Sequence, residues 1–150
     1  MTTTYLNLIK RGAGYYPERT AIVFNGESLT FQATDALSNQ LAHALIARGV
    51  TRGTRVALLL NNSLYSVPVD FACVKAGINR VPLNARLSLN EHLKMLEETG
   101  CDLLIHGADL AGRANELANA LPALRCHGIG SRDGGGDDLL ADAGEHSDQA

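Results

Sequence analysis

The most constraining feature of the sequence is the apolar run Val56–Leu60, which is five residues long and the longest in the chain. A membrane-spanning helix needs about 20 apolar residues, so this run is far too short to cross a bilayer. It also lacks the polar–apolar alternation of a half-exposed strand, and it therefore predicts a strand over Arg55–Leu60 that is buried on both faces. Such strands occur in parallel sheets covered by helices on both sides, which favours an α/β protein.

Other short apolar runs alternate with segments of helical spacing along the chain. The further strands are predicted over Ala21–Phe24, Ser28–Phe31, Ile78–Leu83, Asp102–His106 and Arg125–Ile129. The helices are predicted over Gln32–Arg48, Leu64–Ala76, Ser88–Gly100 and Asp109–Leu121. The predicted fold class is α/β: an open, mostly parallel sheet with helices on both faces (flavodoxin-like), preceded by an N-terminal β-hairpin around Asn25-Gly26.

Several residues mark the expected helix ends. Thr30 can cap the first helix, and Gly49 follows it where a left-handed residue is favoured. Ser88-Leu89-Asn90-Glu91 fits a capping box, and Gly100 ends that helix. Pro68, inside the second predicted helix, is expected to remove a hydrogen bond or bend the first turns.

Composition and charge exclude several classes of protein. Hydrophobic residues make up 45% of the 150-residue chain and charged residues 19%, which is typical of one folded domain and not of a disordered chain. The net charge of −3 argues against a nucleic-acid partner. Residues 1–7 lack the basic and apolar regions of a secretory signal, and no segment could span a membrane, so we predict a soluble, cytoplasmic protein.

The charge is unevenly distributed along the chain. Residues 131–150 carry a net charge of −5, which leaves +2 for residues 1–130. Gly134–Gly136 is a predicted flexible break, followed by one helical turn over Leu139–Ala143. We therefore predict an α/β unit over 1–130 and an acidic, Gly-rich linker or tail over 131–150.

No pattern of cysteines or histidines predicts a metal site. Cys73, Cys101 and Cys126 are far apart, lack a C-x-x-C motif, and are expected to be buried, inert thiols in a reducing compartment. The histidines lack metal-ligand spacing and are expected to be surface or partly packed side chains: His43, His92, His106, His127 and His146. The neighbouring Arg48, Arg52 and Arg55 are expected to be solvated charges near a helix end.

Complete catalytic motifs are also missing from the sequence. There is no G-x-x-x-x-G-K-[ST] phosphate loop and no G-x-S-x-G nucleophile elbow. Gly128-Ile129-Gly130 follows a predicted strand, but Asp133 replaces the third glycine of a dinucleotide fingerprint. The residues alone therefore indicate an α/β domain without a complete active site.

An ordered set of short motifs adds a family resemblance. The motifs are Tyr16–Ala21 (YPERTA), Leu29–Phe31 (LTF), Leu37–Ala42, Gly49–Ser63, Lys75–Gly77 and Val81–Leu87 (VPLNARL). Collinear over about residues 5–130, they resemble the start of the AMP-forming acyl-CoA synthetase and adenylate-forming ligase family. Thr54, Ala33 and Ala85 depart from the pattern, at turns and caps.

The resemblance implies that the chain is part of a larger ligase N-terminal domain. The intact enzyme would use ATP and Mg to convert a carboxylic acid, a fatty acid or related compound, into an acyl-adenylate, and then CoA to form the thioester. The family's phosphate loop, ribose-binding aspartate and C-terminal lysine have no counterpart in 1–150. The remainder of the ligase chain is then the main partner, and 1–150 alone is expected to be inactive.

One position could contribute to the reaction of the intact enzyme. The resemblance places a cofactor-binding arginine, which contacts the phosphates of CoA in some members, at Arg86. A guanidinium suits this role because its planar fork can donate two hydrogen bonds to a phosphate. The alternative is a surface arginine paired with a carboxylate.

Other interpretations of the whole chain remain open. The main alternative is a self-standing, non-catalytic α/β binding or interaction module, and a third is an unrelated flavodoxin-like protein. The acyl substrate, the choice between CoA and a carrier-protein acceptor, and the formation of a homo-oligomer are all left open by the sequence.

Overall fold

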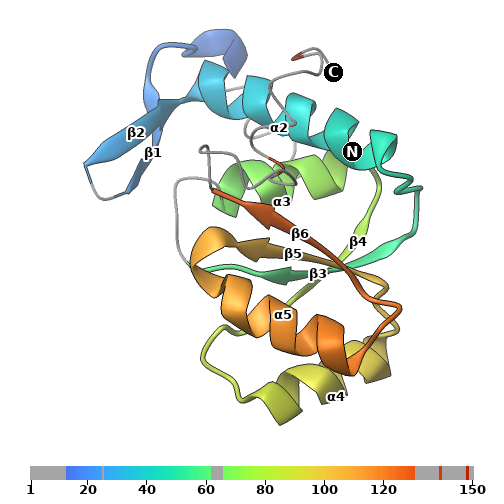
Figure 1. The fold of residues 1–150 in the computed structure, drawn as a ribbon. Coiled ribbons are helices and arrows are strands. Elements are labelled where there is room, and N and C mark those ends of the chain that lie inside the picture. Colours follow the sequence, from blue (N-terminus) through green and yellow to red (C-terminus); the bar gives the residue numbers. More distant parts are fainter. Residues whose placement is uncertain (1–12, 25, 62–65, 131–138, 140–147, 149–150) are drawn as a thin grey trace.

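The computed structural model describes residues 13–24, 26–61, 66–130, 139 and 148. Within these residues, an antiparallel hairpin precedes a four-stranded parallel sheet that has helices on both faces (Figure 1). The predicted fold class is therefore confirmed.

The hairpin consists of β1 (Thr20–Phe24) and β2 (Glu27–Thr30). The two strands pair antiparallel from Thr20 opposite Thr30 to Phe24 opposite Glu27. Gly26, in the turn, has a φ of 79°, which is the left-handed conformation that favours glycine. Asn25, the other predicted turn residue, lies outside the described residues.

The helix that follows the hairpin, α2, covers Phe31–Ala47. Its cap is the predicted one, because the Thr30 hydroxyl accepts a hydrogen bond of 3.0 Å from the Ala33 N–H. This cap ends β2 at Thr30 and begins the helix at Phe31, which the sequence assigned to the strand. Gly49 follows the helix with a φ of 91°, as predicted.

Four strands form the parallel sheet: β3 (Arg55–Leu59), β4 (Asn79–Pro82), β5 (Leu103–Gly107) and β6 (Arg125–Ile129). Their spatial order is β4-β3-β5-β6. The first strand of the sheet thus lies between the second and the third, which is the arrangement of flavodoxin-like proteins.

The helices form two layers. α2 and α3 (Ser66–Lys75) cover one face of the sheet, whereas α4 (Leu89–Thr99) and α5 (Ala111–Ala120) cover the other (Figure 1). A short 3₁₀ turn, η1 (Ala108–Leu110), leads into α5. In the part of the chain that the structure describes, no helix is long and apolar enough to cross a membrane.

The core lies on both sides of the central strand β3. Val56 and Leu58 pack with α2 and α3, whereas Ala57 and Leu59 pack with α4 and α5. All four side chains are buried, because successive residues of a strand point to opposite faces. The predicted two-sided burial of the apolar run is confirmed at these positions.

The start of α4 is fixed by the predicted capping box. The Glu91 N–H donates to the Ser88 hydroxyl over 3.2 Å, and the Ser88 N–H donates to Glu91 Oε1 over 3.4 Å. Gly100 ends the helix with a φ of 68°. Two free N–H groups at the beginning of α4 are thereby satisfied, which holds the end of the preceding loop in place.

Pro68 is tolerated for a positional reason. It is the third residue of α3 as the structure describes this helix, and so it lies in the first turn. N–H groups in the first turn have no acceptor within the helix, and the proline therefore removes no intrahelical hydrogen bond there.

Of the predicted tail, only Leu139 and Asp148 are described. Leu139 is buried in the core cluster that also contains Leu41 and Ile105. The predicted break at Gly134–Gly136 lies outside the described residues, and the division of the chain at residue 130 stays a prediction.

Candidate functional site

The carboxyl ends of the strands form the edge at which open parallel α/β sheets bind ligands. The predicted site residue Arg86 lies on the segment that connects β4 to α4, and this segment leaves β4 at its carboxyl end. Arg86 therefore lies at the carboxyl edge of the sheet.

The connecting segment, residues 83–88, is named here the β4–α4 loop. At its beginning, the Leu83 N–H donates to the Leu58 carbonyl over 2.8 Å, which extends the pairing of β4 with β3 by one residue. At its end, Ser88 is the cap of α4. Both ends of the loop are thus attached to the rigid part of the fold.

Asn84 organises the middle of the loop. Its side-chain Oδ1 accepts a hydrogen bond of 3.0 Å from the backbone N–H of Arg86. Its backbone carbonyl accepts one of 3.1 Å from the Leu87 N–H. An asparagine that bonds to the backbone two residues later forms a common type of tight turn, and here it fixes the backbone from which the Arg86 side chain leaves.

Arg86 itself is exposed to solvent. Among the residues that the structure describes, no hydrogen bond or ion pair involves its guanidinium. The carboxylate partner that the alternative interpretation expects is therefore not found among these residues. The five N–H donors of the group are therefore available to an anion that reaches this edge.

The loop rests on a buried histidine. His92, on the first turns of α4, is fully buried, and its Nε2 lies 2.7 Å from the carbonyl oxygen of Asn84. Its Nδ1 lies 2.9 Å from Nη1 of Arg113. Because a carbonyl only accepts and a guanidinium only donates, these partners define a neutral imidazole with its proton on Nε2.

The prediction of a surface or partly packed side chain is wrong for His92. Position 92 follows Leu89 by three residues and precedes Leu96 by four, so it lies on the buried stripe of α4. That spacing is the signal that could have identified the burial. His43, His106 and His127 are partly exposed, as predicted, and His146 lies outside the described residues.

Arg113, which the sequence did not single out, connects α5 to the loop. Its Nη1 donates to the Leu87 carbonyl over 3.0 Å as well as contacting His92. Its Nε lies 3.7 Å from Oε1 of Glu116 in a partly exposed ion pair. One guanidinium thus contacts both the loop and the histidine that supports it.

A second polar contact lies at the same edge, between the central strands. The Asn61 side chain, just after β3, donates to Oδ2 of Asp109 over 2.8 Å, in the turn after β5. Asn61 belongs to the segment Asn61–Ser63 that carries part of the family resemblance; Asn62 and Ser63 are outside the described residues. This contact joins the ends of β3 and β5, the neighbouring strands between which the strand order of the sheet reverses.

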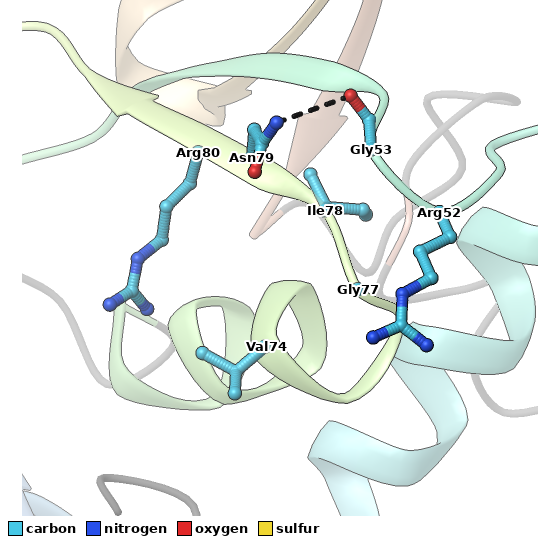
Figure 2. A pocket seen from close by; sticks show the side chains of 7 residues that line it. All are labelled: Arg52, Gly53, Val74, Gly77, Ile78, Asn79 and Arg80. Atoms are coloured by element: carbon cyan, nitrogen blue, oxygen red, sulfur yellow. Dashed lines mark hydrogen bonds between the residues drawn. The ribbon is translucent and has the colours of Figure 1, made fainter.

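A cavity of about 570 Å³ lies at the opposite edge of the sheet, where β3 and β4 begin (Figure 2). Its lining residues are Arg52, Gly53, Val74, Gly77, Ile78, Asn79 and Arg80. The arginines flank it, but Arg80 pairs with Asp70 over 2.6 Å, and Arg52 packs over Gly77. The cavity is at the amino ends of the strands, away from Arg86.

The arginine cluster near this cavity also has structural contacts. Arg52 and Arg55 are exposed, in agreement with the prediction of solvated charges. Arg55 donates to the Thr99 carbonyl over 2.9 Å, and Nη1 of Arg48 lies 2.6 Å from Nδ1 of His127. Arg55, at the beginning of β3, thus contacts the end of α4, and Arg48, directly after α2, contacts β6.

The surroundings of Cys73 and Cys126 disfavour a reactive thiolate. Cys73 and Cys101 are buried, and Cys126 is partly exposed. Burial, followed by the nearby Asp70 carboxylate, raises the pKa of the Cys73 thiol to about 12. Burial also raises the pKa of Cys126. Such thiols stay protonated at neutral pH, when they are poor nucleophiles.

Comparison with known proteins identifies the family. The family model of AMP-binding enzymes matches residues 9–149. The 2-succinylbenzoate–CoA ligase of Bacillus subtilis is 34% identical over 105 residues, which are 70% of this chain and 22% of that protein. The fatty acid–[acyl-carrier-protein] ligase ScoC of Streptomyces coeruleorubidus is 37% identical over 92 residues, 61% of this chain and 18% of that protein.

Solved structures agree with these relatives. A fatty acyl CoA synthetase from Mycobacterium tuberculosis superposes with a TM-score of 0.80 at 27% identity, covering 95% of this chain and 28% of that one. The o-succinylbenzoate CoA synthetase of Bacillus subtilis in complex with AMP gives 0.76 at 25% identity, covering 96% and 34%. The chain spans about a fifth of the curated relatives described above. It belongs to the AMP-binding enzyme family.

Proposed function

We propose that this chain is the N-terminal part of an ATP-dependent, AMP-forming ligase that joins a carboxylic acid to coenzyme A. In this reaction, a carboxylate oxygen attacks the α-phosphorus of ATP and releases pyrophosphate. The thiol then attacks the acyl carbon and releases AMP. Family membership and the CoA ligases among its relatives support the proposal.

No group of three or more His, Cys, Asp and Glu side chains that could hold a metal ion lies in the described part of the chain. We propose that the remainder of the ligase chain holds ATP and Mg, that 1–150 alone is inactive, and that 1–130 forms the α/β subdomain ahead of an acidic linker. The ligase is proposed to act in the cytoplasm.

The Arg86 guanidinium is suited to bind one of the proposed substrates, CoA, through its phosphates. The observation that carries this assignment is an exposed guanidinium without a partner among the described residues, on a loop with a fixed course at the carboxyl edge of the sheet. A phosphate at this position would receive charge-assisted hydrogen bonds, which are stronger than neutral ones. Arg86 would then bind CoA without taking part in adenylation.

The test uses the complete ligase that contains this chain, obtained by extending the gene sequence past codon 150. Arg86→Ala should raise the KM for CoA about tenfold, the loss expected for a hydrogen bond to a charged group. The KM for pantetheine, which has the thiol but no phosphate, should not change, nor should carboxylate-dependent exchange of pyrophosphate into ATP.

Lys94→Ala is the matched control, because Lys94 is an exposed cation on the neighbouring helix α4. It should leave both KM values unchanged. If Arg86→Ala also leaves the KM for CoA unchanged, the assignment of Arg86 is wrong. A stop codon directly after codon 150 would contradict the proposal that this chain is part of a ligase. It would favour the alternative, a self-standing binding module.

A carrier protein is the second candidate for the acyl acceptor. ScoC, whose acceptor is an acyl carrier protein, is 37% identical to the matched part of this chain. Transfer of the acyl group to a carrier protein in preference to free CoA would favour this candidate. The acyl substrate is proposed only as a fatty acid or related carboxylic acid.

A further inference from the structure

We propose that His92 and Arg113 are positioning residues for Arg86. Neither side chain is assigned to the coenzyme; both act through the β4–α4 loop that carries the arginine. The inference rests on the proposed role of Arg86 in binding CoA, and it adds the groups that determine where this guanidinium lies.

Two backbone carbonyls of the loop, one before and one after Arg86 in sequence, each accept a hydrogen bond from a side chain of a neighbouring helix. His92 donates to the carbonyl of Asn84, two residues before Arg86. Arg113 donates to the carbonyl of Leu87, the residue after it. The backbone that carries Arg86 is therefore fixed on both sides by side chains from α4 and α5.

The two supporting side chains also fix each other. Arg113 donates to Nδ1 of His92, which leaves the Nε2 proton directed at the Asn84 carbonyl. This choice of tautomer follows from the contact with Arg113, and the wrong tautomer would place a lone pair against the carbonyl. Loss of either residue would therefore disturb both anchored carbonyls.

A role in positioning differs from a role in stability alone. A substrate-binding group must be held closely, since a displacement of about 1 Å can reduce catalysis on the order of a hundredfold. A buried network that only stabilises the fold would lower the melting temperature without selecting the CoA step. The network around Lys75, on the other face of the sheet, provides that comparison.

The experiment measures the complete ligase with His92→Leu, Arg113→Met and His92→Gln. Leucine fills the space but forms no hydrogen bonds, whereas the neutral amide of glutamine has an NH₂ group that can donate to the Asn84 carbonyl and an oxygen that can accept from Arg113. His92→Leu and Arg113→Met should raise the KM for CoA roughly fivefold, with no change in the KM for pantetheine or in pyrophosphate exchange. His92→Gln should restore the KM for CoA to within about twofold of the wild type.

The double variant His92→Leu/Arg86→Ala tests whether the histidine acts through Arg86. Its KM for CoA should equal that of Arg86→Ala alone, because a positioning residue has nothing left to position. Lys75→Met is the matched control: it should lower the melting temperature and leave the KM for CoA unchanged. If His92→Leu does not fold, Arg113→Met and the double variant Arg113→Met/Arg86→Ala carry the same comparison.

The outcomes separate the two proposals. If Arg86→Ala leaves the KM for CoA unchanged, the proposed role of Arg86 fails, and the positioning role fails with it. If Arg86→Ala raises this KM but the variants of His92 and Arg113 change only stability, the positioning role alone is overturned. Additive effects in the double variant would also overturn it.

Discussion

Lys75 and His92 are buried polar side chains on opposite faces of the sheet, and they connect different parts of the molecule. Lys75, on α3, bonds to side chains of α2 and so joins two helices. His92, on α4, bonds to the β4–α4 loop and to α5. The comparison shows that burial of a polar group does not reveal a functional role by itself. The role depends on which segment the polar group contacts. Of these two side chains, His92 contacts the β4–α4 loop that contains Arg86, whereas Lys75 contacts α2.

Lys75 has several hydrogen-bond acceptors on α2. Its ammonium lies 2.7 Å from Oδ1 of Asp35, 2.6 Å from the Ser38 hydroxyl and 2.7 Å from Oδ1 of Asn39. An ammonium has three N–H donors, so it can donate to several of these acceptors at once. The Lys75 side chain is 9% exposed and that of Asp35 26%, whereas Ser38 and Asn39 are buried, so the loss of the ammonium would leave polar groups with little access to water.

The largest effect on stability is therefore expected for Lys75→Met. This substitution keeps an unbranched side chain, one heavy atom shorter, but removes the donor to the Asp35 carboxylate and to the side chains of Ser38 and Asn39. Breaking a largely buried ion pair should lower the free energy of unfolding by about 3 kcal/mol. Urea unfolding followed by circular dichroism would measure it; a loss below about 0.5 kcal/mol would show that water replaces the ammonium.

A smaller loss, about 2 kcal/mol, is expected for His92→Leu, since one carbonyl and one guanidinium N–H lose a neutral partner. Amide hydrogen exchange should locate the effect: exchange of the Arg86 and Leu87 N–H groups should accelerate, whereas exchange within α2 should not. Equal acceleration in both regions would mean that His92 stabilises the whole fold and does not act on the loop in particular.

The fold could be predicted from local signals because most of them act within a few residues. The capping box of Ser88 and Glu91, the cap at Thr30 and the left-handed glycines each involve neighbours in the sequence. The two-sided burial of Val56–Leu59 follows from composition alone. The errors lie at element boundaries, as at Phe31, where a helix cap overrides a strand-like side chain.

The support of the site could not be predicted in the same way. Arg86 was singled out by a family motif, but Arg113 reaches the loop from 26 residues away in sequence. Nothing in the local pattern around Arg113 indicates which carbonyl it meets, because that contact depends on how α4 and α5 pack together. His92 could have been placed in the core from its spacing to Leu89 and Leu96, but its hydrogen bonds could not.

Cys73 offers a pH test on the face of the sheet that contains Lys75. Its pKa is raised from 9.0 to about 12 by burial first and by Asp70 second. Between these two values the unfolded chain has lost the proton that the native chain keeps, so stability falls as pH rises. The decrease should approach about 1 kcal/mol per pH unit above pH 9, and Cys73→Ala should reduce it.

The measurement for Cys73 is the free energy of unfolding at pH 8 and pH 10. Cys126, whose pKa is raised by burial alone, contributes a slope of the same sign and serves as the comparison through Cys126→Ala. If Cys73→Ala leaves the difference between the two pH values unchanged, burial of this thiol does not control the alkaline loss of stability.

The smallest effect is expected for Lys94→Ala, on the exposed side of α4. Lys94 and Glu98 are four residues apart with 3.9 Å between the charged atoms, and their side chains are 77% and 64% exposed. Water screens such a pair, and lysine before glutamate is the weaker order on a helix, so the change in unfolding free energy should be about 0.3 kcal/mol. Urea unfolding in low and high salt would measure it. A loss of unfolding free energy as large as that of His92→Leu would contradict this expectation. It would mean that the exposed charges of α4 stabilise this face of the sheet as much as the buried imidazole of His92 does.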